Sequence, residues 1–236
     1  MSSSKISVGL CMVFGSLWFT KADAQVSYKK TYWGNTVESS FSSALFSKPG
    51  KDESLSTLRV SNVFNVALTL NHDFSNVVGI YTGIGIRNIG FTEKYKAADS
   101  TVKRRVYCLE VPAGIKIGSM YRRRYIVLGG GADFAFNYKE KGYVRRGNKD
   151  KFNEWLSDRT EIIMPFVFAG VSFNPGLVFR VQYYPQNFLK PGFTDDNGVK
   201  PYAGYNTNLL MLNIGIDIHH HNPPGKELQG AKGMVQ

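Results

Sequence analysis

The sequence has almost no cysteine, and beyond its first residues it has no long apolar run. Cys11 lies in the N-terminal leader, so a chain without that leader keeps only Cys108 and cannot form an intramolecular disulfide. After residue 25 no segment approaches the ~20 apolar residues that a membrane-spanning helix needs. These two absences argue against a disulfide scaffold and against a helical membrane protein.

The first residues carry the three parts of a secretory signal peptide. Lys5 precedes an apolar run over residues 6–19, and Ala22-Asp23-Ala24 gives a small-x-small ending. A lipoprotein signal is the alternative, but Cys11 lies inside the apolar run and follows the bulky Leu10. We therefore expect residues 1–24 to be a cleaved signal peptide and the chain to be secreted.

Glycine, aromatic residues and positive charge are abundant instead. The chain has 24 glycines, is 14% aromatic and carries a formal net charge of +11. Glycine and aromatic residues in short, evenly spaced strands are typical of β-barrels. For a protein that follows a secretion signal, lipid phosphates are a better anionic partner than nucleic acid, so we expect no nucleic-acid binding.

Eight segments alternate between apolar and other residues with the period of a β-strand. They are Asn35–Phe46, Thr57–Asn71, Val77–Phe91, Lys103–Gly118, Arg122–Tyr138, Glu161–Phe173, Leu177–Tyr184 and Tyr205–Ile218. The first has the weakest pattern. The segment Glu161–Phe173 is apolar on both faces, so its orientation stays open.

The connections between these segments alternate in length. Three are tight turns, at His72–Asn76, Ser119–Tyr121 and Asn174–Gly176, whereas those at Lys139–Thr160 and Pro185–Gly204 are long and polar. Short turns at one rim and long loops at the other are typical of bacterial outer-membrane barrels with periplasmic termini.

The pattern therefore predicts an all-β fold: a transmembrane, up-and-down, antiparallel β-barrel of about eight strands over residues 25–218. We expect short periplasmic turns, long extracellular loops and a flexible periplasmic tail at residues 219–236. The expected location is the outer membrane of a Gram-negative bacterium.

A soluble lipocalin-like barrel is the alternative, with apolar residues inside and polar residues outside. The polar face here is rich in glycine and has four acids matched by four bases, which suits a narrow lumen filled by ion pairs. We predict this network from Glu38, Arg59, Arg87, Glu110, Lys116, Asp133, Arg180 and Asp217. The apolar face gathers an aromatic girdle towards the long loops, formed by Tyr107, Phe136, Tyr138 and Tyr183.

Two strands resemble a known family. The stretch Tyr107–Lys116, YCLEVPAGIK, is similar to the "YLEIPL-x-LK" strand of the PorT-like outer-membrane β-barrel family of Bacteroidota. The glycine-rich segment 77–85, VVGIYTGIG, resembles the strand that precedes it in that family. The resemblance implies an outer-membrane location and, for some members, a role in secretion. One departure is that the chain continues for 18 residues past Ile218 instead of ending on an aromatic residue.

The residues give little support for catalysis, a cofactor or a metal. No histidine is expected on the outer-leaflet side, where lipid-modifying barrels place a general base. Asp133 or Asp195-Asp196 could act as a base, but no nucleophile pairs with them. The run 219–221 is three adjacent histidines, which on an extended chain point alternately to opposite sides and cannot all ligate one ion. Cys108 is expected to face inward as an inert residue.

Two of the expected extracellular loops, residues 92–105 and 139–160, are strongly basic. Such loops could hold lipopolysaccharide phosphates or an acidic partner, or could be solvated charge alone. Interleaved aromatic residues favour contact. The candidate contact residues are Lys94, Lys96, Arg104, Arg105, Arg145, Arg146, Lys149, Lys151 and Trp155.

Two function hypotheses remain. The first is a non-enzymatic accessory or scaffolding subunit of a larger outer-membrane secretion or assembly complex, with other envelope proteins as partners. The second is a stand-alone barrel that binds lipopolysaccharide or a small ligand through its basic loops, or that modifies lipid as an enzyme.

Overall fold

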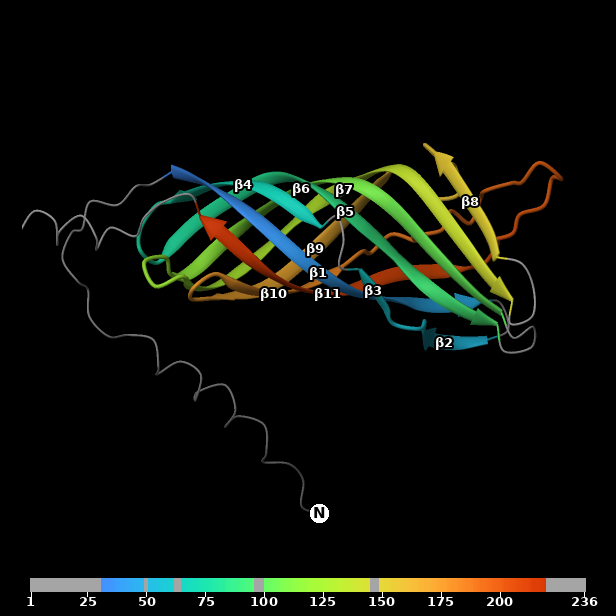
Figure 1. Cartoon of the computed structure of the whole chain (residues 1–236), viewed down its shortest axis with the longest axis horizontal. Helices are drawn as coiled ribbons and strands as arrows, with labels where there is room; N and C mark the ends of the chain where they lie inside the picture. The colour runs from blue at the N-terminus through green and yellow to red at the C-terminus, as the bar shows by residue number, and fades with distance from the viewer. Residues whose placement is uncertain (1–30, 49–50, 62–64, 96–99, 145–148, 220–236) are drawn as a thin grey trace, which may run out of the picture.

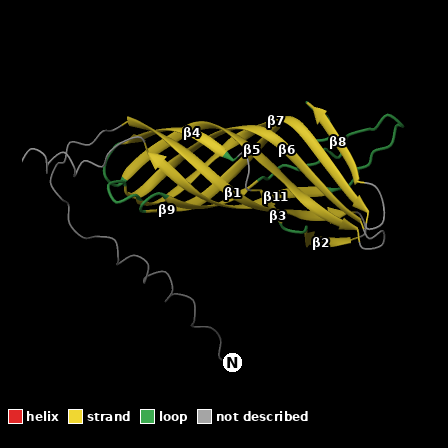
Figure 2. Cartoon of the chain, viewed as in Figure 1, coloured by secondary structure: helices red, strands yellow, loops and turns green. Residues whose placement is uncertain are grey.

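The computed structural model describes residues 31–48, 51–61, 65–95, 100–144 and 149–219. The expected signal peptide and nearly all of the expected tail lie outside these residues. All regular structure within them is β-strand, as the colouring of Figure 2 shows. Over the same ranges, no helix is long and apolar enough to cross a membrane.

The described residues form one antiparallel sheet that closes on itself (Figure 1). The strands are β1 (Thr31–Lys48), β2 (Lys51–Leu55), β3 (Arg59–Ser61), β4 (Val66–Asp73), β5 (Val78–Tyr95), β6 (Ser100–Ser119), β7 (Arg124–Val144), β8 (Lys149–Trp155), β9 (Ile163–Phe173), β10 (Leu177–Tyr183) and β11 (Asn206–His219). Closure comes from the long pairing of β11 with β1.

The closed ring contains eight strands, as the alternation predicts. Its members are β1, β4, β5, β6, β7, β9, β10 and β11, each paired with the next and β11 paired with β1. The predicted strand Thr57–Asn71 corresponds to two strands, because β3 and β4 both pair with β1 and residues 62–64 between them lie outside the described ranges. The strands β2 and β8 pair with β1 and β7 beyond the ring.

Apolar side chains cover the outside of the ring, and polar ones fill the inside. Ile84 is 50% exposed, Leu128 48% and Val181 50%, whereas the inward Glu110 is 2% exposed and Asp133 0%. This arrangement is the reverse of a lipocalin. Exposed apolar surface of this extent needs lipid around it, and closure leaves the lipid-facing backbone without an open edge. The chain is therefore a membrane-spanning β-barrel of the outer-membrane kind.

The strand whose orientation was open, β9, places its bulkiest residues inside. Met164, Phe166 and Phe168 are buried, while Ile163 and Val167 are 52% and 55% exposed. The inward aromatic rings fit because the neighbouring strand β7 carries glycines where these rings lie. The apolar interior of β9 therefore depends on glycine in the next strand.

Two segments expected to be extracellular loops are mostly strands. β5 continues as far as Tyr95, and β6 already begins at Ser100. β7 continues to Val144, and β8 then pairs back along it. Both faces of these extensions carry polar residues, so the apolar alternation that marks a membrane strand is missing. The chain thus builds a sheet of β5, β6, β7 and β8 beyond the apolar belt, the band of exposed apolar residues around the ring. This sheet lies on the side expected to be extracellular, and we call it the extracellular sheet (Figure 1).

The predicted aromatic girdle is wrong at Tyr138. Tyr107 and Phe136 lie on the outer face and Tyr183 is half-buried, but Tyr138 is 1% exposed and belongs to the interior. The cause is a bulge between β6 and β7, where Tyr107 pairs with Asn137 but Cys108 pairs with Ala135. One extra residue in β7 reverses the faces of the residues that follow.

A charge placed on the lipid-facing surface tests this orientation. Arg in place of Leu128, which lies in the apolar belt near the start of β7, is expected to destabilise the folded barrel in a bilayer by about 1–3 kcal/mol, because the cost falls from roughly 2–4 kcal/mol at the midplane towards zero at the interfaces. Urea unfolding of the barrel refolded in phosphatidylcholine vesicles measures this. Val199→Arg, in the 184–205 loop and 56% exposed, is the control and should have little effect. Equal stability of the two variants would mean that Leu128 does not face lipid.

Candidate functional site: a filled lumen and a basic extracellular sheet

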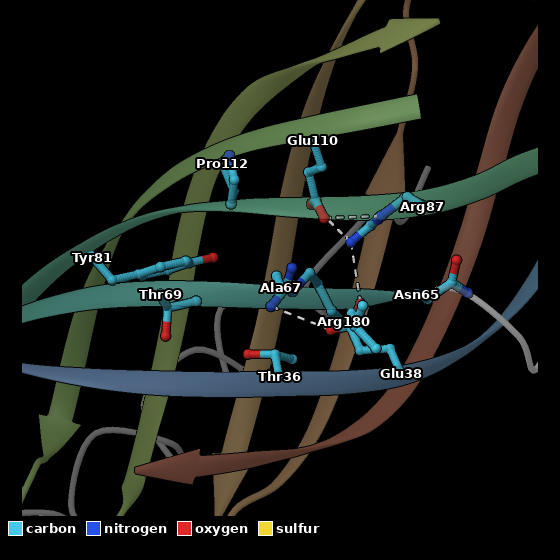
Figure 3. A pocket seen from close by; sticks show the side chains of 11 residues that line it. Thr36, Glu38, Asn65, Ala67, Thr69, Tyr81, Arg87, Glu110, Pro112 and Arg180 are labelled. Atoms are coloured by element: carbon cyan, nitrogen blue, oxygen red, sulfur yellow. Dashed lines mark hydrogen bonds and ion pairs between the residues drawn. The ribbon is translucent and has the colours of Figure 1, made fainter. Parts of the chain in front are cut away.

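A cluster of charged side chains crosses the middle of the lumen (Figure 3). Arg87 of β5 forms ion pairs with Glu38 of β1 at 3.2 Å and with Glu110 of β6 at 2.8 Å. It also donates a hydrogen bond to Gln182 of β10, on the other side of the ring. Arg180 lies 3.3 Å from Glu38. Four of the eight residues predicted for the network therefore meet in one place.

This cluster leaves little room in the barrel. The cavity beside it, lined also by Tyr81 and Thr69, measures about 10 Å³, roughly the space of one water molecule. An eight-stranded barrel is just wide enough for its own side chains to fill. The described lumen is thus packed with ion pairs at this level.

A second ion pair closes the barrel nearer the short turns. Lys116 lies 2.6 Å from Asp73 and donates hydrogen bonds to Tyr32 at 2.9 Å and Asn71 at 3.1 Å. Asp73 was not among the predicted network residues because the sequence pattern assigned it to a turn. It is the last residue of β4, is 1% exposed and points inward.

The remaining predicted network residues bind neutral side chains. Asp133 accepts a hydrogen bond from the Tyr184 hydroxyl, and Asp217 accepts one from Thr36. Arg59 donates to the side-chain oxygen of Asn88 on β5. These three predicted residues therefore belong to the polar interior through hydrogen bonds to neutral groups.

Above the lumen, Arg104 is a component of the barrel mouth and not an exposed contact residue. It lies 2.6 Å from Glu93 and 3.4 Å from Glu140, and its guanidinium lies 6.0 Å from the centre of the Tyr202 ring. The prediction fails because β5 and β6 extend this far, so that alternate residues still point inward. Burial raises the pKa of Tyr95, whose hydroxyl donates to Glu93.

The 184–205 loop packs over the same mouth. Arg159 lies between two rings, 4.6 Å from the centre of Phe152 and 4.7 Å from that of Phe193. Its guanidinium also donates a hydrogen bond to the Tyr202 hydroxyl at 3.3 Å. A bridge between Thr160 and Leu189 ties the loop to the chain before β9. Ordered side-chain and backbone contacts therefore cover the mouth of the barrel.

The outer face of the extracellular sheet is basic. Of the predicted contact residues, Lys94 and Lys151 are exposed and Arg105 is half-buried there. Lys96, Arg145 and Arg146 lie outside the described residues, as does the side chain of Lys149. Lys103, Lys139 and Lys141 also lie on this face, although they were not among the predicted contact residues.

An aromatic row runs directly below these bases. The ring of Phe136 stacks on Trp155 at 6.0 Å and lies 6.5 Å from Tyr107. Trp155 is 69% exposed, and the Lys139 ammonium lies 5.0 Å from the centre of the Tyr107 ring. The apolar belt begins below this row, at Leu109 on β6. Tyr and Trp in this position are typical of a membrane–water interface.

The candidate catalytic and metal positions show structural contacts. Asp133 is fully buried, and the Asp195 carboxylate accepts backbone hydrogen bonds from Asn197 and Val199 within its own turn. Cys108 is buried. Within the described ranges, no group of three or more His, Cys, Asp or Glu residues is arranged to hold a metal ion. The side chains of His219–His221 lie outside them.

The chain is similar to known proteins only at the level of solved structures. No protein-family model matches the chain, and no curated protein matches its sequence. Among solved structures, it is similar to Ail of Yersinia pestis in complex with the heparin analogue sucrose octasulfate, with 15% identity, 80% of this chain and 100% of that chain covered, and a TM-score of 0.38.

Two other solved barrels are similar to the same extent. For Neisserial surface protein A, from Neisseria, the identity is 10%, the coverage 80% of this chain and 99% of that chain, and the TM-score 0.39. For CarO of Acinetobacter baumannii these values are 13%, 75%, 96% and 0.34. At such scores the likeness adds no argument, and the barrel fold rests on the strand pairings themselves.

Proposed function

We propose that the chain is a non-enzymatic barrel of a Gram-negative outer membrane, with both termini in the periplasm. In this proposal it serves as an accessory or scaffolding subunit of a larger secretion or assembly complex. One observation carries the proposal: Arg87, Glu38 and Glu110 fill the lumen, so the barrel offers little space for transport or for a substrate. Its rims and outer surface are then the parts that act. The resemblance to the PorT-like family supports the same role.

The edge strand β8 is our candidate docking site for a partner. It pairs with β7 over Lys149–Trp155 and with no other strand in the described part of the chain. Figure 1 shows it at the margin of the molecule, beyond the closed ring. The outer edge of such a strand presents backbone donors and acceptors to which a strand of a partner protein can add.

Recovery of bound proteins tests the subunit role. A tag on the 219–236 segment allows purification from intact membranes in mild detergent, followed by mass spectrometry. We expect a defined set of other envelope proteins to remain bound. Recovery of the barrel with lipid alone would contradict the subunit role and favour the stand-alone alternative.

A proline in β8 tests the docking edge. Asn153→Pro removes a backbone donor and bends the strand, so we expect recovery of the partner proteins to fall at least tenfold. Asn153→Ala, which changes the same side chain but leaves the backbone, should keep them. Because β8 lies outside the ring, both variants should retain the electrophoretic mobility of the folded barrel. Full recovery with folded Asn153→Pro would rule out this edge.

A further inference from the structure

The four strands of the extracellular sheet align their residues in rows across the outer face. One row contains Thr92, Lys103, Lys141 and Lys151, which are successive partners on β5, β6, β7 and β8. The row below it contains Gly90, Arg105, Lys139 and Asn153. The row above includes Lys94, paired with Thr101. Cross-strand partners share a face, so all six bases lie on one surface.

Acids are absent from these rows and lie on the opposite face. Glu93 and Glu140 lie one position out of step with the bases and contact Arg104 at the mouth. Glu154, next in sequence to the outward Asn153, lies 3.6 Å from Arg159. The charges of the extracellular sheet are therefore sorted: in the described part of the chain, acids contact bases at the mouth, and the outer rows contain bases but no acid.

Such an arrangement is unfavourable for an isolated sheet. Lys103 and Lys151 both lie directly opposite Lys141, and like charges in that position repel each other. Neighbouring strands are ~4.8 Å apart, so the three lysines fall within about 10 Å. A surface of this kind suits a ligand with several negative charges at similar spacing.

The position of the bases indicates where that ligand lies. Arg105 and Lys139 are two residues, roughly 7 Å of strand, beyond the row of Tyr107 and Asn137, next to which Trp155 lies. That row marks the interface, because the apolar belt begins with Leu109 directly below it. The bases therefore stand at the height of lipid head groups and slightly above them.

We propose that the outer face of the extracellular sheet binds the phosphate groups of the glycolipid in the outer leaflet, that is, of lipopolysaccharide. Lys103, Lys141 and Lys151 contact the phosphates, and the row of Tyr107, Phe136 and Trp155 packs against the base of the acyl chains. This site lies on the outside of the barrel and does not depend on the docking role proposed for the edge of β8.

A triple variant tests the site. The probe is bis-phosphorylated lipid A, titrated into detergent micelles that hold the full barrel, with bound lipid counted by native mass spectrometry. We expect Lys103→Gln/Lys141→Gln/Lys151→Gln to bind lipid A at least tenfold more weakly than the unchanged chain. The unchanged chain should also lose binding as salt is raised, because the contact is electrostatic.

Matched controls separate this site from net charge. Arg122→Gln/Arg124→Gln/Lys200→Gln removes the same charge from exposed positions on the short-turn rim and in the 184–205 loop, and it should bind lipid A normally. The unchanged chain should bind lipid A without its phosphates at least tenfold more weakly. Equal loss in both triple variants, or equal binding of the phosphate-free lipid, would overturn the proposal.

Two further outcomes bear on it. Binding of soluble inorganic polyphosphate as tightly as lipid A would overturn the lipid as the ligand, since the aromatic row would then contribute nothing. The lysine triple variant should also resist urea at least as well as the unchanged barrel when no lipid A is present, because like-charge repulsion is removed. If the triple variant does not fold, Lys141→Gln alone is tested in its place. It keeps the other two lysines and should bind lipid A with an affinity between that of the unchanged chain and that expected for the triple variant.

Discussion

Replacing Arg87 with leucine is expected to destabilise the barrel by about 3–5 kcal/mol. The change leaves the carboxylates of Glu38 and Glu110 buried without the cation that contacts both of them, at 3.2 Å and 2.8 Å. A buried charge that loses its partner keeps its desolvation cost but loses the attraction that offsets it. Equilibrium unfolding in urea, from phosphatidylcholine vesicles, measures the loss.

Removing both partners should cost much less than removing one. In Arg87→Leu/Glu110→Leu the ion pair is replaced by apolar groups, a change that is often close to neutral. Glu38 keeps Arg180 at 3.3 Å in that variant. Arg124→Leu, on the exposed rim, is the control, with an expected effect within about 0.5 kcal/mol. If Arg87→Leu were no less stable than this control, the lumen cluster would not hold the barrel together.

The barrel itself could be predicted because its membrane strands obey a simple rule. Outward residues such as Leu128 meet lipid and inward ones such as Glu110 meet the filled lumen, so the sequence alternates with period two. The partners inside the lumen could not be predicted in the same way. Arg87 contacts Glu38, which lies two ring positions away, and Gln182, which is 95 residues later in the chain. Such contacts depend on ring closure and side-chain length, which period-two alternation does not report.

The extracellular sheet was missed for a different reason. Above the membrane both faces of β6 and β7 are polar, so Lys103 and Arg104 look alike in the sequence although one is exposed and the other buried. Only the register with β5 and β7 separates them. The bulge opposite Tyr107 could not be predicted either, because it moves the following residues of β7 to the opposite face without changing the composition of the strand. The basic character of these segments was readable, but its confinement to one face was not.

Replacing a glycine of β7 with a larger residue is also expected to cause a large loss of stability. Gly131→Val should destabilise the barrel by roughly 3 kcal/mol or more, or prevent its assembly, because overpacked interiors must shift backbone or rings. A Cβ at this position would lie 2.6 Å from the tip of the Phe166 ring and in collision with the Val111 carbonyl oxygen. The fraction of protein with the mobility of the folded barrel, followed during refolding into vesicles, measures the effect.

A smaller pair of changes shows whether the ring of Phe166 is the obstacle. Gly131→Ala should be destabilising alone, and Phe166→Leu should restore part of the loss by withdrawing the ring tip, so the two effects should differ from additivity by at least ~0.5 kcal/mol. Gly192→Ala is the control, since its Cβ would meet nothing within 4 Å. Strict additivity would mean that glycine at 131 serves the contact with the β6 backbone alone. A coupled result would explain how β9 can be apolar on both faces: its inward aromatic rings occupy the space that glycine leaves on β7.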